Sequence, residues 1–307
     1  MPPLRLVFAG SPAAAVPSLR SLIASDHEVV AVLTREDSPQ GRRGVLTPTA
    51  VADAAGDIEL IKANRLAGAA TERIQQLAPD LGVIVAYGGL VREPLLSTPR
   101  LGWINLHFSL LPRWRGAAPV QRAIIAGDDA TGATVFQLVP ELDAGDVFAQ
   151  VPASIGRHQS AGGLLDALSI TGAELLLRVV DDLAAGTATA TPQSGEVTLA
   201  PKLSLADGRL DWRQDAVTIV NHLRGVTPEP GAFTTVDGAR LKVLDAVIAR
   251  EAPRLAPGQL ALAGRSLHVG SATDPIELVT VQPAGKKPMA AADWWRGRPT
   301  TSTGVAE

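Results

Sequence analysis

The sequence contains no cysteine among its 307 residues. This absence excludes disulfide bonds, a thiol nucleophile and cysteine-based metal sites, and it is typical of proteins from a reducing compartment. Long hydrophobic runs are also missing near the start, where the run Leu6-Val-Phe-Ala9 is far shorter than a signal peptide or a membrane span. The sequence therefore predicts a soluble cytoplasmic protein with no membrane association.

Several catalytic signatures are absent as well. Residues 10–17, which follow the first apolar run, lack the G-x-G-x-x-G spacing, no serine lies in G-x-S-x-G, and the five histidines are too scattered for a helix-borne zinc motif. These absences argue against dinucleotide binding, a serine hydrolase and a metalloenzyme, and we expect no metal cofactor.

Neither positive nor negative charge is in large excess. The net charge is −3, and the part of the chain from residue 207 onward is only marginally positive. An obligate nucleic-acid binder is often plainly basic, so composition alone does not indicate a nucleic acid as partner. Local arginines, such as Arg42 and Arg43 in a glycine-flanked loop, carry more information.

The first half of the chain alternates apolar runs with segments of helical periodicity. The runs predict strands at residues 4–9, 29–33, 81–86, 103–107 and 135–139, and the periodic segments predict helices at 16–23, 69–77 and 120–126. Such alternation predicts an α/β domain with a Rossmann-like, mostly parallel sheet, in which ligands lie outside the carboxyl ends of the strands.

Composition changes twice after this region, and the chain is longer than one domain needs. A long predicted helix at residues 163–185 closes a domain spanning 1–185. Small polar residues then predict an exposed linker over 186–205. From residue 206 to 307, short apolar segments separated by Gly, Pro and Asp predict a small β-barrel.

An asparagine and a histidine lie two residues apart where one predicted strand ends, in Asn105-Leu-His107. Because side chains of a strand alternate between its faces, Asn105 and His107 are predicted to point the same way. An amide donor beside an imidazole can stabilise charge on a carbonyl oxygen and move a proton. This strand end is therefore the candidate active site.

A carboxylate is expected to join them from the segment after the strand at 133–139, which contains both Asp143 and Asp146. If the two strands are neighbours, either residue can reach His107. A carboxylate there is expected to favour the imidazolium and to raise the pKa of His107.

These motifs carry a resemblance to a known family. Asn105-Leu-His107, Ser109-Leu-Leu-Pro112 and Leu142-Asp143-Ala-Gly145 resemble the Asn, His and Asp motifs of the folate-dependent formyltransferases. The segments at residues 113–122 and 282–289, Arg-Trp-Arg-Gly-Ala-Ala-Pro-Val-Gln-Arg and Gln-Pro-Ala-Gly-Lys-Lys-Pro-Met, are similar to the branch that acts on methionyl-tRNA. The resemblance runs from Leu6 to about Trp295.

The resemblance implies transfer of the formyl group of 10-formyltetrahydrofolate to the amine of initiator methionyl-tRNA, without a covalent enzyme intermediate. It implies an OB-like C-terminal barrel and a further wall of the cofactor site at residues 85–90. The implied site residues are the catalytic Asn105, His107 and Asp143, the cofactor-binding Ser109, Leu110, Leu111 and Pro112, and the tRNA-binding Arg42 and Arg43, which act with the linker and the barrel.

Two other functions remain open from the sequence. One is a 10-formyltetrahydrofolate enzyme that acts on a sugar nucleotide or a purine precursor, although resemblance to those enzymes should fade after about residue 185, whereas here it persists to Met289. The other is a noncatalytic tRNA-binding module, against which the intact Asn105, His107 and Asp143 argue. The sequence leaves the oligomeric state open.

Overall fold

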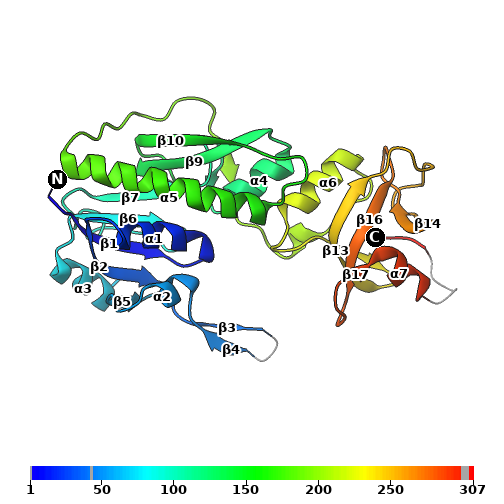
Figure 1. Ribbon diagram of the computed structural model, residues 1–307, viewed down its shortest axis with the longest axis horizontal. Coiled ribbons are helices and arrows are strands. Elements are labelled where there is room, and N and C mark those ends of the chain that lie inside the picture. Colours follow the sequence, from blue (N-terminus) through cyan, green and yellow to red (C-terminus); the bar gives the residue numbers. More distant parts are fainter. Residues whose placement is uncertain (1, 42–43, 299–303) are drawn as a thin grey trace. The chain divides into compact units, whose positions relative to one another are not determined.

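The computed structural model describes residues 2–41, 44–298 and 304–307 (Figure 1). The chain divides into two compact units. The first contains Met1–Pro119, Ala130–Ser154 and Leu165–Ala200, and the second contains Val120–Asp129, Ile155–Leu164 and Pro201–Glu307. The units therefore interleave along the sequence.

A seven-stranded sheet organises the first unit. Its strands, in spatial order, are β10 (Val147–Ser154), β9 (Ala130–Gln137), β7 (Trp103–His107), β6 (Leu81–Val85), β1 (Arg5–Gly10), β2 (Glu28–Thr34) and β5 (Leu60–Lys62). The strands from β7 to β5 are parallel to one another, whereas β9 and β10 are antiparallel to their neighbours. The predicted mostly parallel α/β sheet is confirmed.

Helices form where the periodicity predicts them. The helices α1 (Val16–Ile23) and α3 (Ala69–Leu77) have the predicted bounds, while α4 (Pro119–Ala126) and α5 (Ala161–Ala185) begin one or two residues earlier than predicted. A short helix, α2 (Ala50–Ala54), was not predicted; it begins after Thr49, whose hydroxyl accepts a hydrogen bond from the Ala52 N–H.

The edge strand β10 was also not predicted. Its residues alternate between half-buried and exposed, and it contains Pro152. Proline cannot donate to a strand ladder, so it is tolerated at an edge such as this one. Its neighbour β9 begins five residues earlier than the apolar run at 135–139 indicates, because Thr131, Gly132 and Ala133 pair with β10.

The central strands β1, β6 and β7 are buried on both faces, as expected for strands covered by helices. On one face, Val7 and Ala9 of β1 pack in a cluster with Ile74 of α3 and with Trp103 of β7. On another part of the sheet, Gly172 of α5 lies against Leu106 of β7, where a side chain would come within 3.2 Å of the leucine. Small residues thus let the long helix approach the strand that carries the candidate site.

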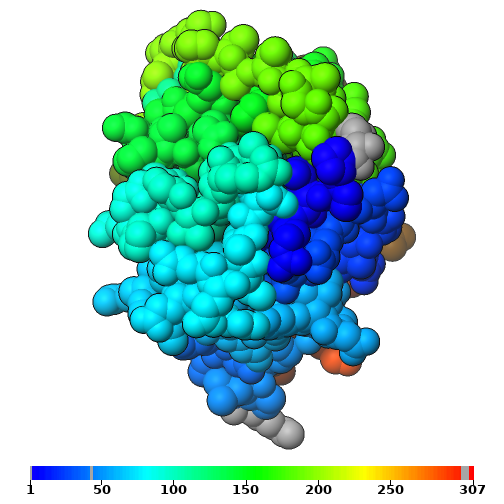
Figure 2. All heavy atoms as spheres, turned by 90° about the vertical axis from the view of Figure 1, so that its left-hand side faces the viewer, coloured from blue at the N-terminus to red at the C-terminus, as the bar shows by residue number. Residues whose placement is uncertain are grey.

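Polar contacts join the start of the chain to later segments. The His27 ring accepts a hydrogen bond from the Leu4 N–H at its Nδ1 and contacts the Asp181 carboxylate of α5 at its Nε2, at 3.0 Å. The Arg5 N–H donates to Asp80. In Figure 2 the dark blue N-terminal residues accordingly lie between the cyan and green parts of the first unit, so that distant segments make one surface.

Residues 187–200, here called the strap, return along the first unit after α5 ends. Thr191 exchanges two backbone hydrogen bonds with Val147 of β10. Further on, β11 (Leu199–Ala200) pairs in parallel with β8 (Arg115–Gly116). The strap falls within the segment that the sequence predicts as a linker, and in the structure it is part of the first unit and is hydrogen-bonded to the rest of that unit near both of its ends.

The second unit has an antiparallel sheet at its centre. Its strands are β12 (Phe233–Val236), β13 (Ala239–Ile248), β16 (Ile276–Pro283), β15 (Ser266–Val269), β14 (Leu260–Ala263) and β17 (Met289–Ala290), and its helices include α6 (Ala216–Gly225) and α7 (Ala291–Arg296). Residues 304–307 hydrogen-bond to Thr235 on one side and to Gly258 and Leu260 on the other, so they connect the two edges of the sheet.

No helix among the described residues is both long and apolar enough to cross a membrane.

Close packing at Gly82 generates a stability prediction. A β-carbon at this position of β6 would lie 2.1 Å from the ring of Trp103, which is fully buried and donates its indole N–H to the Leu95 carbonyl. We expect Gly82→Ala to lower the free energy of unfolding by about 1–3 kcal/mol, which is the typical cost of adding an atom group to a well-packed core. Thermal unfolding followed by tryptophan fluorescence measures the change.

Gly163→Ala in α5 is the matched control, because its β-carbon would meet nothing closer than 3.7 Å. Alanine is favoured over glycine inside a helix, so this variant should be as stable as the parent or more so. Equal midpoints for the Gly82→Ala protein and the parent would show that the Trp103 site can relax.

Candidate active site

The structure places Asn105 and His107 at the carboxyl end of β7, two residues apart on one strand. They pair with Phe136 and Thr134 of the antiparallel strand β9. The Asn105 side chain makes no hydrogen bond to any residue that the structure describes, and it lies on the wall of a cavity. Its amide is therefore available to a ligand.

The imidazole of His107 is almost completely buried, with 6% of the side chain exposed. Its Nε2 lies 2.8 Å from the carbonyl oxygen of Trp114. Because a carbonyl oxygen only accepts hydrogen bonds, Nε2 must carry the proton. In the neutral ring, Nδ1 therefore keeps its lone pair, and this atom faces the Asp143 carboxylate at 3.8 Å.

Of the two aspartates that the sequence leaves open, Asp143 is the one that reaches His107. Its Oδ2 accepts a hydrogen bond from the Gly116 N–H at 2.7 Å, and 12% of its side chain is exposed. Asp146 is exposed, and its backbone carbonyl accepts a hydrogen bond from Gln137. The structure thus brings Asn105, His107 and Asp143 together.

The predicted direction of the His107 pKa is wrong. Burial of the ring lowers the pKa of His107 below its ordinary value, and the Asp143 charge and the hydrogen bond to Trp114 offset this only in part. The physical reason is that the carboxylate is 3.8 Å away, too far for a hydrogen bond, while the ring has lost almost all contact with water. His107 is therefore neutral in the folded protein near pH 7.

A cavity of about 300 Å³ opens beside Asn105 and Asp143, which line its wall, while His107 lies behind Asp143 and is not among the lining residues. This is the lower end of the range for small-molecule sites, about 300–1000 Å³. Two apolar side chains on its wall, Leu90 and Leu142, are 67% and 56% exposed, so they are free to cover a ligand. The cavity is lined by Ile84, Ala86, Tyr87, Gly88, Gly89, Leu90, Val91, Asn105, Gly116, Ala117, Leu138, Val139, Pro140, Glu141, Leu142 and Asp143.

None of the predicted cofactor-binding residues Ser109, Leu110, Leu111 and Pro112 lines this cavity. These four residues form a turn. The hydroxyl of Thr134 in β9 stabilises the turn, because it donates to the Ser109 carbonyl and accepts from the Leu111 N–H. The Ser109 hydroxyl, fully buried, donates to the Arg113 carbonyl. The predicted further wall at residues 85–90 does contribute to the cavity.

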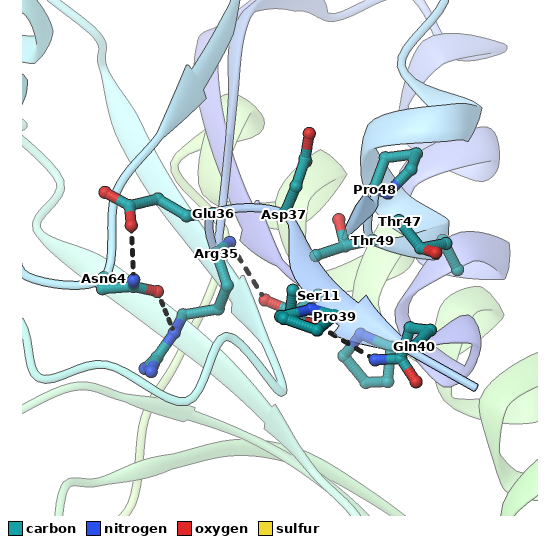
Figure 3. Close-up of a pocket in the computed structure, with 13 residues that line it drawn as sticks. Ser11, Arg35, Glu36, Asp37, Pro39, Gln40, Thr47, Pro48, Thr49 and Asn64 are labelled. Atoms are coloured by element: carbon teal, nitrogen blue, oxygen red, sulfur yellow. Dashed lines mark hydrogen bonds between the residues drawn. The ribbon is translucent and has the colours of Figure 1, made fainter. Parts of the chain in front are cut away.

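A larger hollow, of about 760 Å³, lies where β1, β2 and β5 end (Figure 3). Its polar side chains satisfy one another: Arg35 donates to Asn64, and Asn64 donates to Glu36. Asp37 forms an ion pair with Lys62 at 2.6 Å. The cavity beside Asn105 is therefore the better candidate for the active site, because the Asn105 amide has no hydrogen-bond partner among the described residues.

The second hollow extends to the hairpin of β3 (Ser38–Gln40) and β4 (Val45–Thr47). The predicted tRNA-binding residues Arg42 and Arg43 belong to this region of the sequence and lie outside the described residues. Arg35 links the two hollows, since it also donates to the carbonyl of Gly88 on the wall of the smaller one.

Sequence reasoning missed the part of the cavity wall formed by residues 138–142 and the Gly116 N–H that holds Asp143. Pro140 marks the end of a predicted strand, and this was the available signal for a loop at the site. No local pattern indicates that Gly116 reaches Asp143, because that contact spans 27 residues.

Comparisons with known proteins identify the family of the chain. A family model described as formyl transferase matches residues 4–180, and a second, described as the formyl transferase C-terminal domain, matches residues 202–299. A methionyl-tRNA formyltransferase from Clavibacter sepedonicus is 58% identical over 296 residues, which cover 96% of this chain and 97% of the relative.

Solved structures share the fold at low identity. An N-formyltransferase from Helicobacter canadensis, in complex with folinic acid and dTDP-3-aminofucose, superposes with a TM-score of 0.69 at 15% identity, covering 91% of this chain and 99% of the other. HypX from Aquifex aeolicus, in complex with tetrahydrofolic acid, gives 0.65 at 18% identity, covering 95% of this chain and 47% of the other. The chain belongs to the formyltransferase family and, within it, to the methionyl-tRNA formyltransferases.

Proposed function

We propose that this protein transfers the formyl group of 10-formyltetrahydrofolate to the free amine of initiator methionyl-tRNA in the cytoplasm. The observation that carries the proposal is the unpartnered Asn105 amide at a cavity wall beside Asp143 and the neutral His107. An acyl transfer needs a donor for the developing oxyanion and a group that manages one proton, and this site supplies both.

Asn105 is the oxyanion donor in this proposal. When the amine attacks the formyl carbon, a new C–N bond forms and the formyl oxygen gains negative charge. The Asn105 amide N–H donates to that oxygen. A preorganised donor of this kind typically accounts for about 10²- to 10³-fold in rate.

The His107–Asp143 pair handles the proton. The attacking amine must lose one proton, and N10 of the folate must gain one as its bond to the formyl carbon breaks. Nδ1 of neutral His107 can accept the amine proton, and the Asp143 carboxylate at 3.8 Å stabilises the resulting imidazolium. The same proton is then available for N10, so no covalent enzyme intermediate is needed.

The folate ring fits the cavity wall of residues 86–91 and 138–142. Apolar side chains such as Leu90 and Leu142 would cover the ring, and backbone groups of the two loops would read its polar edge. Ser109, Leu110, Leu111 and Pro112 contribute by fixing the loop that leads to Trp114, which binds His107.

The tRNA is assigned to Arg42 and Arg43, to the segment 186–205 and to the second unit. Arginine side chains bind phosphate by charge and by paired hydrogen bonds. The net charge of the second unit is close to zero. Individual basic side chains rather than overall charge must therefore bind the tRNA phosphates.

A direct assay tests the function. Purified protein is incubated with formyl-labelled 10-formyltetrahydrofolate and methionyl-initiator tRNA, and label in the aminoacyl ester is counted. Free methionine and an amino-sugar nucleotide serve as competing acceptors. Transfer to the sugar nucleotide but not to the tRNA would assign the chain to a different formyl acceptor.

Replacement of the two strand residues tests the chemistry. Asn105→Ala and His107→Ala should each lower kcat by at least about 10²-fold, because both groups act on charge that develops in the transition state. Binding of tRNA, measured by filter retention, should change little. Turnover close to that of the parent in either variant would remove that residue from the mechanism.

The electrostatic role of Asp143 is tested by NMR. The His107 imidazole, assigned by its loss in His107→Gln, should titrate with a pKa below about 6.5 in the parent protein. In Asp143→Asn the charge that favours the imidazolium is gone, so the pKa of His107 should fall further. An unchanged or higher pKa in Asp143→Asn would contradict the pairing.

The assignment of Arg42 is tested by salt dependence. If this arginine neutralises one tRNA phosphate, Arg42→Ala should weaken tRNA binding and reduce the slope of log affinity against log salt by about 0.7–0.9. Folate binding should be unaffected, because none of the described residues of this loop lines the cavity beside Asn105. An unchanged slope would exclude Arg42 from the tRNA contact.

A further inference from the structure

The two polar groups that face the ring nitrogens of His107 belong to residues with unusual backbone conformations. Trp114 has a φ of 61° and Asp143 a φ of 47°, both in the left-handed region that few non-glycine residues adopt. Such conformations persist only where the surrounding structure holds them, and they often occur at functional sites. The question is which residues hold Trp114 and Asp143.

The strap holds Trp114. The Trp114 N–H donates to the hydroxyl of Thr198 at 2.9 Å, while the Trp114 carbonyl accepts from Nε2 of His107 at 2.8 Å. The carbonyl of Thr198 accepts from the next residue, through the Arg115 N–H, also at 2.9 Å. Thr198 thus fixes the peptide that sets the tautomer of His107.

The strap also holds Asp143. The side-chain amide of Gln193 donates to the carbonyl oxygens of Asp143 and Gly145, at 2.8 and 2.9 Å. The other end of the same amide accepts from Arg115, whose Nη2 lies 2.6 Å from Oε1. Arg115 is adjacent to Gly116, which donates to the Asp143 carboxylate. Gln193 therefore connects the two loops that meet at Asp143.

We infer that Gln193 and Thr198 are positioning residues for the formyl transfer, which hold the Asp143 loop and the Trp114 peptide so that His107 stays in its reactive tautomer. The inference rests on the proposed roles of His107 and Asp143. The strap would then position catalytic groups, in addition to connecting α5 to the residues from Pro201 onward.

The competing explanation is that Gln193 and Thr198 only help the strap to pack. Substitutions at these two residues distinguish a packing role from a positioning role. Gln193→Glu keeps the acceptor for Arg115 but has no N–H for the carbonyls of Asp143 and Gly145. Thr198→Val keeps the shape but removes the hydroxyl that accepts from Trp114, and Thr198→Ser restores that hydroxyl. Ile170→Ala, at an exposed side chain of α5 outside the sites assigned to folate and tRNA, is the control.

The experiment measures kcat, both KM values and the His107 Nε2–H signal in the full-length variants. We expect Gln193→Glu and Thr198→Val to lower kcat at least about 10-fold, because a misplacement of about 1 Å at a reacting group can cost about 10²-fold. Both KM values should stay within about twofold. Thr198→Ser and Ile170→Ala should behave like the parent.

NMR supplies a readout that does not depend on turnover. With ¹⁵N-labelled histidine, the His107 Nε2–H should be resolved and slow to exchange in the parent and in Ile170→Ala. In Thr198→Val it should exchange faster or give way to the Nδ1–H tautomer, whereas Thr198→Ser should restore it.

Two results would overturn the inference: parent-like kcat in both Gln193→Glu and Thr198→Val, or a fall in kcat accompanied by an unchanged Nε2–H signal in Thr198→Val. Failure of the proposed function is recognised separately. In that case the parent itself transfers no formyl group to methionyl-tRNA, and the NMR comparison still tests whether the strap sets the His107 tautomer.

Discussion

The site depends on one physical constraint, the burial of a neutral imidazole at the end of a central strand. With 6% of its side chain exposed, His107 is disfavoured as a cation, and its Nε2–H needs a carbonyl acceptor. Trp114 supplies that acceptor from a residue whose backbone takes a left-handed conformation. The lone pair of Nδ1 is then left facing Asp143, and a ring nitrogen with a free lone pair can accept a proton.

The surroundings of His107 follow from the same constraint. Thr134, which pairs with it across the strands, binds the turn at residues 109–112 from inside the protein. That turn leads to Trp114, so the strand, the turn and the acceptor carbonyl form one connected structure. Asn105, two residues earlier on β7, is left without a protein partner among the described residues and is free to act on substrate.

Much of the first unit could be predicted from sequence because its strands are buried and its helices amphipathic. The apolar run at 103–107 and the helical spacing at 16–23 give the observed bounds. The edge strand β10 was missed, since a half-exposed strand with Pro152 lacks a strong pattern. The direction of the His107 pKa was wrong because burial depends on tertiary packing, and the choice between Asp143 and Asp146 depends on loop geometry that no periodicity encodes.

The path of the strap has a consequence for dissecting the protein into pieces. The two family models cover residues 4–180 and 202–299, so the strap belongs to neither. A fragment that stops where α5 ends would keep every strand of the seven-stranded sheet, yet it would lack Gln193 and Thr198. A fragment that continues to Ala200 would keep both, and with them the hydrogen bonds to Asp143 and Trp114. A fragment meant to keep the hydrogen bonds around His107 must therefore extend past residue 180, where the first family model ends.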